Sequence, residues 1–136
     1  MTWWSEYIGK PYEANARGPE AFDCWGLVET VFREALDIGV PSYGDIDTND
    51  LLAVARKMHK PEDVGPWVQA HQAETFDVML ASQRAGTRRP GHVGIMVNSQ
   101  EVLHVWKGTN VCVMRIDHDF LTGRVLGFYR HREIAC

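Results

Sequence analysis

Apolar residues follow a helical period in the first part of the chain and an alternating period after residue 75. From Cys24 onward they recur at offsets of 3, 4, 7, 8, 11 and 12, which is the spacing of one stripe along a helix. Asp23 is the expected N-cap of this helix, and Gly39 together with Pro41 is expected to close it. The stripe that faces the core then consists of Leu27, Val28, Val31, Phe32, Ala35 and Leu36.

Two further helices are predicted from the same period. Residues 3–8 carry apolar side chains three and four positions apart, which indicates a short amphipathic helix. A second helix is predicted from Asp50 to about Lys60, where Asn49 is a candidate cap and Pro61 stops the helix.

Five segments in the second half of the chain alternate between apolar and polar residues and are predicted to be strands. The short gaps from the second strand to the fourth favour antiparallel hairpins, because a parallel crossover needs a dozen or more residues. Helices followed by a strand meander indicate an α+β fold, with N-terminal helices packed on a five-stranded, mainly antiparallel sheet. The predicted strands are Phe76–Leu80, His92–Asn98, Val102–Lys107, Val111–Ile116 and Val125–Arg130.

Composition and charge narrow the classes of function. A chain of 136 residues with 45% hydrophobic residues is expected to form a single domain over residues 1–136. The net charge of −4 and the absence of a basic run argue against nucleic acid as a partner. The N-terminus lacks the pattern of a signal peptide, and no stretch reaches the ~18 apolar residues of a membrane span, so synthesis in the cytoplasm without membrane insertion is expected.

Cys24 is the main candidate for chemistry. It lies at the predicted start of a helix, where the dipole and unpaired backbone N–H groups favour a thiolate. These conditions lower the pKa of a cysteine and make it a nucleophile. The three cysteines form no C-x-x-C pair, which disfavours a disulfide framework or a zinc knuckle.

His92 and His104 are the candidate partners of this thiol. Because side chains alternate along a strand, His92 shares a face with Gly94, and His104 shares a face with Trp106. A three-residue loop around Ser99 would make the histidines neighbours, whereas a two-residue turn would place them on opposite faces. In the first case His92 serves as general base and His104 orients its ring, with the backbone N–H of Cys24 as an oxyanion donor.

A metal site formed by Cys24, His92 and His104 is a weaker alternative, because it needs a fourth ligand or a water. A cysteine at a helix start is better explained as a nucleophile. We therefore expect no metal and no cofactor.

The chain resembles the NlpC-type papain-like cell-wall peptidases, and most closely the branch encoded by tailed bacteriophages and gene-transfer agents. The resemblance implies a circularly permuted papain-like fold and cleavage of an isopeptide bond in the peptidoglycan stem, typically between γ-D-glutamate and a diamino acid. The segments that carry it are residues 8–12 (Ile-Gly-Lys-Pro-Tyr), 22–28 (Phe-Asp-Cys-Trp-Gly-Leu-Val), 91–95 (Gly-His-Val-Gly-Ile), 103–104 (Leu-His) and 126–130 (Leu-Gly-Phe-Tyr-Arg).

The resemblance also assigns residues around the thiol. Tyr12 corresponds to a tyrosine near the thiol and the substrate, and Asp23 helps to shape the substrate pocket. Trp25 stands where many family members carry a serine, and with Tyr12 and Asp23 it is predicted to line the substrate site. Phe76 stands where a glycine is expected before Asp77.

Two functions are compatible with the resemblance. In the first, the chain is a peptidase of a phage or gene-transfer-agent tail tip that opens the wall locally, with stem peptides and other tail proteins as partners. In the second, the chain is a structural tail-assembly subunit with the same fold, in which catalysis is incidental or lost. Intact Cys24, His92 and His104 favour the enzyme.

Overall fold

The computed structural model describes residues 2–40, 67–82, 84–88 and 90–135, and it confirms the helix that begins at Cys24. This helix, α1, spans Cys24–Leu36, and the carboxylate of its N-cap Asp23 accepts a hydrogen bond from the Gly26 N–H at 2.6 Å. The predicted closure by Gly39 is wrong, because the chain already turns at Asp37, which takes the left-handed conformation (φ 54°). Aspartate tolerates that conformation since its short side chain bonds locally.

The other helices of the described residues are short. The segment predicted at residues 3–8 forms one turn of 3₁₀ helix, η1, at Ser5–Tyr7. A final turn, α3, spans Arg132–Ala135 and lies beside β1 and β6, described below. The helix predicted from Asp50 to Lys60 lies outside the described residues, as does Pro41. Within the described part of the chain, no helix has the length and hydropathy to cross a bilayer.

The sheet has six strands rather than the five predicted. All pairs are antiparallel in the order β1-β6-β2-β3-β4-β5, which confirms the hairpins expected between the second and fourth predicted strands. The missed strand, β1, has only four residues with a single buried position, too few to show an alternating pattern. The strands are β1 Trp67–Ala70, β2 Val78–Ser82, β3 Pro90–Met96, β4 Glu101–His104, β5 Cys112–Arg115 and β6 Val125–His131.

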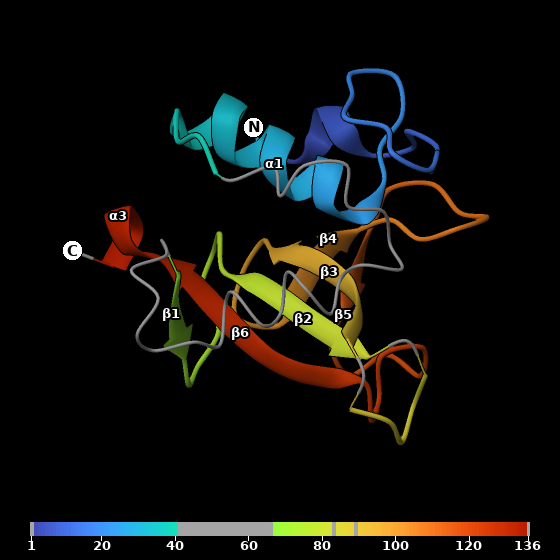
Figure 1. Cartoon of the computed structure of the whole chain (residues 1–136), viewed down its shortest axis with the longest axis vertical. Coiled ribbons are helices and arrows are strands. Elements are labelled where there is room, and N and C mark those ends of the chain that lie inside the picture. Colours follow the sequence, from blue (N-terminus) through green and yellow to red (C-terminus); the bar gives the residue numbers. More distant parts are fainter. Residues whose placement is uncertain (1, 41–66, 83, 89, 136) are drawn as a thin grey trace.

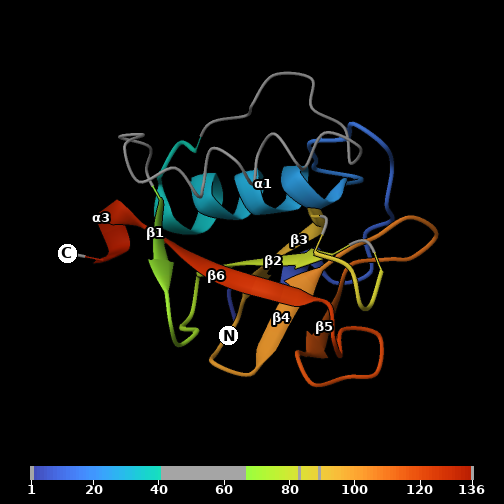
Figure 2. The same ribbon diagram turned by 60° about the horizontal axis from the view of Figure 1, so that its bottom comes forward.

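Each face of the sheet carries its own apolar cluster. Helix α1 lies across one face of the sheet (Figures 1 and 2). The apolar stripe of α1 and the strand residues Val93 and Ile95 belong to the same buried cluster. The opposite face carries Met96 and Val102, which pack against Leu121 from the connection between β5 and β6. Covering both faces buries the apolar side chains of the central strands and produces an α+β architecture dominated by its sheet.

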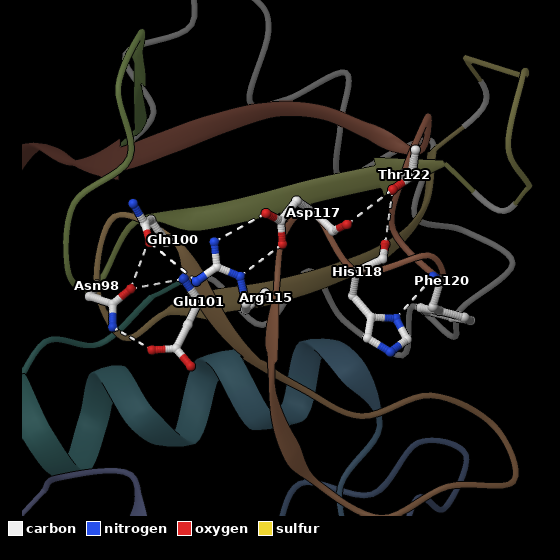
Figure 3. Close-up of polar contacts among 8 residues, drawn as sticks. All are labelled: Asn98, Gln100, Glu101, Arg115, Asp117, His118, Phe120 and Thr122. Carbon is white, nitrogen blue, oxygen red and sulfur yellow. Dashed lines mark hydrogen bonds and ion pairs between the residues drawn. The ribbon is translucent and has the colours of Figure 1, made fainter.

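The register between β3 and β4 determines whether His92 and His104 lie on the same face of the sheet. Ile95 pairs with Leu103 and Met96 with Val102, so even-numbered positions face even-numbered positions. The Val97 N–H donates to the carbonyl of Glu101 at 2.9 Å, so the pairing extends to these residues and leaves a three-residue loop, 98–100. Within it, Asn98 Oδ1 accepts hydrogen bonds at 2.8 Å from the N–H groups of Gln100 and Glu101 (Figure 3). The three-residue alternative is confirmed, and His92 and His104 therefore lie on one face.

Strand β2 begins at Val78, two residues later than predicted. Phe76 adopts a left-handed conformation (φ 73°), which interrupts an extended strand at the position where the family resemblance expects glycine. Its ring packs on Trp3, with ring centroids 4.7 Å apart. The neighbouring Asp77 is fully buried and accepts two hydrogen bonds from Arg130 at 2.8 Å.

Candidate active site

Cys24 is the first residue of α1 and only 1% of its surface is exposed. Hydrogen bonds from the backbone at Val93, Trp25 and Cys24 itself favour the thiolate, but burial has the larger effect and raises the pKa of the thiol to about 12. The expectation of a lowered cysteine pKa is therefore wrong for this state, because desolvation of the thiolate outweighs its backbone donors. At neutral pH the resting residue is a thiol.

His92 and His104 are joined directly by a hydrogen bond of 2.8 Å between His92 Nε2 and His104 Nδ1. Both rings are buried, with 4% and 0% of their surface exposed. Burial lowers the pKa of His92, helped by His104 and by Arg124, and it lowers the pKa of His104 to about 4, helped by Arg124 and His118. The pair is neutral at neutral pH.

This bond determines which nitrogen of His92 is left for chemistry. Nε2 is occupied by His104, so Nδ1 is the nitrogen that remains to accept a proton. The Cys24 thiol meets the backbone at Val93, the residue next to His92. For Nδ1 to accept a proton, His92 must carry its own proton on Nε2 and donate it to His104 Nδ1, and His104 then carries its proton on Nε2. That Nε2 atom is buried and has no hydrogen-bond partner within the described residues.

Gly94 allows the two histidine-bearing strands to approach each other. A Cβ atom added at this position would lie 2.6 Å from Val102 Cγ2, 2.9 Å from the Cβ of His104 and 3.0 Å from the carbonyl oxygen of Leu103. The sequence places Gly94 on the histidine face, and the structure gives the reason for a glycine there: any side chain would push against the strand that carries His104.

Asp23 is buried and engaged on both carboxylate oxygens. Its exposed fraction is 2%, and Arg17 Nη1 donates to each oxygen at 2.6 Å. The Asp23 N–H donates to the carbonyl of Ala16, so the loop before the helix is tied to its first turn. Gly26 makes this possible, since an added Cβ would lie 2.2 Å from the Ala16 oxygen. Arg17 was not predicted, because a single arginine in a loop carries no pattern.

Tyr12 and Trp25 take different positions around the start of α1. Tyr12 is half-buried, and its backbone pairs with Phe22, two residues before Cys24, while its N–H donates to the carbonyl of Thr109 at 3.1 Å. Trp25 has 2% of its surface exposed and packs edge-to-face on Trp67, with ring centroids 6.1 Å apart. The structure thus places Tyr12 beside the helix start and Trp25 in the core. Substrate contacts by Tyr12, Asp23 and Trp25 stay predictions.

Metal ligation does not fit this arrangement. Among the described residues, no group of three or more His, Cys, Asp or Glu side chains is placed to hold a metal ion. The facing nitrogens of His92 and His104 bond to each other at 2.8 Å instead of converging on a common point.

Three residues near the histidines were not predicted as part of the site. The Trp106 ring lies 4.7 Å from the His104 ring, and Phe120 stacks on Trp106 with centroids 4.3 Å apart and planes 19° apart. Arg124 lies over the Phe120 ring, with its Cζ 4.3 Å from the centroid. Trp106 shares a face with His104, which is a signal in the sequence. Phe120 and Arg124 give no such signal, since they come from the loop between β5 and β6.

Comparison with known proteins identifies a matching family and one curated relative. The model of the NlpC/P60 family matches residues 9–130. The γ-DL-glutamyl hydrolase of Bacillus subtilis is 25% identical over 131 residues, which is 96% of this chain and 28% of the relative. The chain therefore spans less than a third of that relative's length.

Solved structures are similar in fold. An NlpC/P60 family protein from Bacillus cereus superimposes with a TM-score of 0.66 at 17% identity, covering 92% of this chain and 36% of that one. The NlpC/P60 domain of the peptidoglycan hydrolase SagA gives 0.59 at 20% identity, covering 93% and 91%. A lipoprotein-like member from Staphylococcus aureus gives 0.64 at 17% identity, covering 95% and 38%.

Proposed function

Because this chain belongs to the NlpC/P60 family, we propose that it is a cysteine peptidase that hydrolyses the stem peptides of peptidoglycan. The observation that carries the proposal is the meeting of Cys24, at the start of α1, with the backbone next to His92, whose Nε2 is bonded to His104. A thiol, a base and a group that orients the base are the parts required for acyl transfer to sulfur.

The proposed mechanism starts from neutral partners. His92 Nδ1 takes the proton of the Cys24 thiol as the sulfur attacks the carbonyl carbon, and the His104 bond holds the imidazolium that forms. The backbone N–H of Cys24 stabilises the oxyanion, while the Gly26 N–H stays bonded to the cap carboxylate of Asp23. The amine leaves with the proton from His92, and water then hydrolyses the thioester.

We propose the bond between γ-D-glutamate and a diamino acid as the target. Support comes from the resemblance of the site segments to wall peptidases and from the relative whose name specifies γ-DL-glutamyl hydrolysis. Many family members carry a serine directly after the cysteine, whereas this chain has the buried Trp25, which cannot replace a substrate contact made by that serine. Tyr12 is therefore the stronger candidate for contacting the substrate.

We further propose that the chain acts in the tail tip of a phage or gene-transfer agent. The support is the resemblance of segments 22–28 and 126–130 to that branch. Proteomics of tail particles purified from the strain that encodes the chain tests this role. The chain should copurify with the tail at a constant ratio, and its absence from intact particles would refute the role.

The alternative is a structural tail-assembly subunit with lost catalysis. One observation favours it: only 1% of the Cys24 surface is exposed, and burial raises the pKa of its thiol. A peptidase needs this sulfur to reach a substrate carbonyl, whereas a structural subunit does not.

A digest of defined muropeptides, followed by mass spectrometry, separates the two functions. The wild type and Cys112→Ala should release the same stem-peptide fragments, and Cys24→Ala should release none. Cys112→Ala controls for the loss of a thiol beside the histidines, because Cys112 is a half-buried residue of β5 that pairs with His104 and is not assigned to the chemistry. Intact muropeptides after incubation with the wild type, or undiminished cleavage by Cys24→Ala, would refute the peptidase.

A further inference from the structure

An aromatic wall, which we define as Trp106 and Phe120, borders the histidine pair on the face of the sheet away from α1. The Trp106 ring lies 4.7 Å from His104 and 6.3 Å from His92. Phe120 stacks flat on Trp106 and lies 6.2 Å from His104. Both wall residues are half-buried, so the wall separates the buried histidines from solvent.

Arg124 fixes this wall to the sheet. Its Nε donates to the carbonyl of Ser82 at the end of β2 at 3.0 Å, and its Nη1 donates to the carbonyl of Phe120 at 3.2 Å. The guanidinium lies 4.3 Å from the centre of the Phe120 ring, a cation–π distance. Arg124 thus holds both the backbone and the ring of Phe120.

The loop that carries Phe120 is also held from its other end (Figure 3). Arg115 forms an ion pair with Asp117 at 2.9 Å, and the Phe120 N–H donates to His118 Nδ1 at 3.0 Å. Thr122 Oγ1 donates to the carbonyl of His118 at 3.1 Å. These contacts are exposed, so we expect them to be weaker than the half-buried contacts of Arg124.

Trp106 is held by the turn that follows it. Its N–H donates to Thr109 Oγ1 at 3.1 Å, and the same hydroxyl donates to the Trp106 carbonyl at 2.7 Å. The carbonyl of Thr109 accepts from the N–H of Tyr12. The turn therefore links the wall to the loop beside the start of α1.

His104 depends on this wall for its orientation. One ring nitrogen bonds to His92, and the other, Nε2, is buried without a hydrogen-bond partner in the described residues. A ring held by a single hydrogen bond can tilt about that bond unless packing prevents it. The tilted contact of the Trp106 ring and the edge contact of the Phe120 ring supply that packing.

We propose that Arg124 is a positioning residue, which keeps His92 and His104 in their hydrogen-bonded geometry by clamping the aromatic wall against them. The catalytic consequence rests on the proposed peptidase function. The positioning itself does not, and it is measurable in the resting protein.

The electrostatic surroundings of the pair include groups from every packed element. Cys24 meets the backbone at Val93, next to His92, Cys112 lies directly opposite His104 on β5, and His118 and Arg124 come from the connection between β5 and β6. Cys24 and Cys112 are neutral thiols, because burial raises both pKa values. Of the described residues that act on both histidines, Arg124 carries the permanent charge, and this charge disfavours their protonation.

Nitrogen-detected NMR of the histidine rings tests the proposal in the full chain. In Arg124→Met, the titration midpoints of His92 and His104 should rise by about half a pH unit or more, and the single tautomer should give way to a mixture. Arg124→Lys keeps the positive charge but loses the planar guanidinium group. The titration midpoints of the two histidines should therefore stay closer to the wild-type values, while the single tautomer should still give way to a mixture. Arg88→Met is the matched control, because Arg88 is exposed.

If muropeptides are cleaved, kcat of Arg124→Lys should fall by about tenfold with an unchanged KM, since only the alignment of the base is altered. A wild type without activity whose midpoints and tautomers still respond to Arg124→Met would support the positioning role while refuting the peptidase. A folded Arg124→Met or Arg124→Lys protein with wild-type tautomers would overturn the positioning role.

Discussion

Substituting Gly94 by alanine tests the packing that brings the histidines together. The added Cβ would lie 2.6 Å from Val102 Cγ2 and 2.9 Å from the Cβ of His104, against 3.4–4 Å for ordinary contact. To reach ordinary contact, the Val102 methyl must therefore move by about 0.8 Å and the strand that carries His104 by about half an ångström. Overpacking of this kind costs about 1–3 kcal/mol, and a gain of about 0.5 kcal/mol from the lower entropy of the unfolded chain offsets only part of it.

Urea unfolding of Gly94→Ala should therefore show a free energy of unfolding lower by about 1–2 kcal/mol, which corresponds to a Tm lower by about 4–8 °C. The bond between His92 and His104 should lengthen, and cleavage of muropeptides should fall by about tenfold or more. Gly39→Ala is the matched control, because no heavy atom lies within 4 Å of its added Cβ. Equal stability and activity of the two variants would refute the idea that close approach at Gly94 aligns the histidines.

The remaining predictions concern the helix start and the pH response. Asp23→Ala should lower the free energy of unfolding by about 2–4 kcal/mol, because it removes the helix cap and the carboxylate that accepts two hydrogen bonds from Arg17 Nη1. Asp117→Ala, which removes an exposed ion pair, should cost less than about 1 kcal/mol. Similar losses for the two variants would contradict this ranking. The pKa of His104 falls from 6.5 to about 4 on folding, and those of His92 and His131 fall as well, so the unfolded chain binds more protons between these values. Stability should be complete above about pH 6.5 and decline toward pH 4.5, by up to about 3 kcal/mol for His104 alone. A free energy of unfolding that stays constant from pH 7 to 5 would show that the histidines are not buried in neutral form.

The helix at Cys24 and the hairpins of the sheet were predictable because their determinants are local. A cap, an apolar stripe and short gaps between strands lie within a few residues of one another, and each acts through neighbouring backbone groups. The six strands were undercounted by one because β1 is short and gains its pairing from β6, some sixty positions away in the chain. The helix end was misplaced because Asp37 took the conformation for which a glycine was expected.

In the candidate site, too, the features set by short segments were predictable and those set by strand pairing were not. The residue types at positions 24, 92 and 104 were identified from motif and alternation, but the sequence left open whether the histidines face each other. The register of β3 and β4 settled this through a three-residue loop capped by Asn98.

The sequence by itself therefore determined which chemical groups are available, because a thiol at a helix start and histidines on alternating strands are properties of short segments. Only the tertiary structure decided the protonation state of these groups. The cysteine pKa is raised instead of lowered, since burial depends on what packs over α1 and not on the helix start alone. Arg17 and Arg124 act on the site from loops whose sequence carries no pattern, because their contacts are made across the fold.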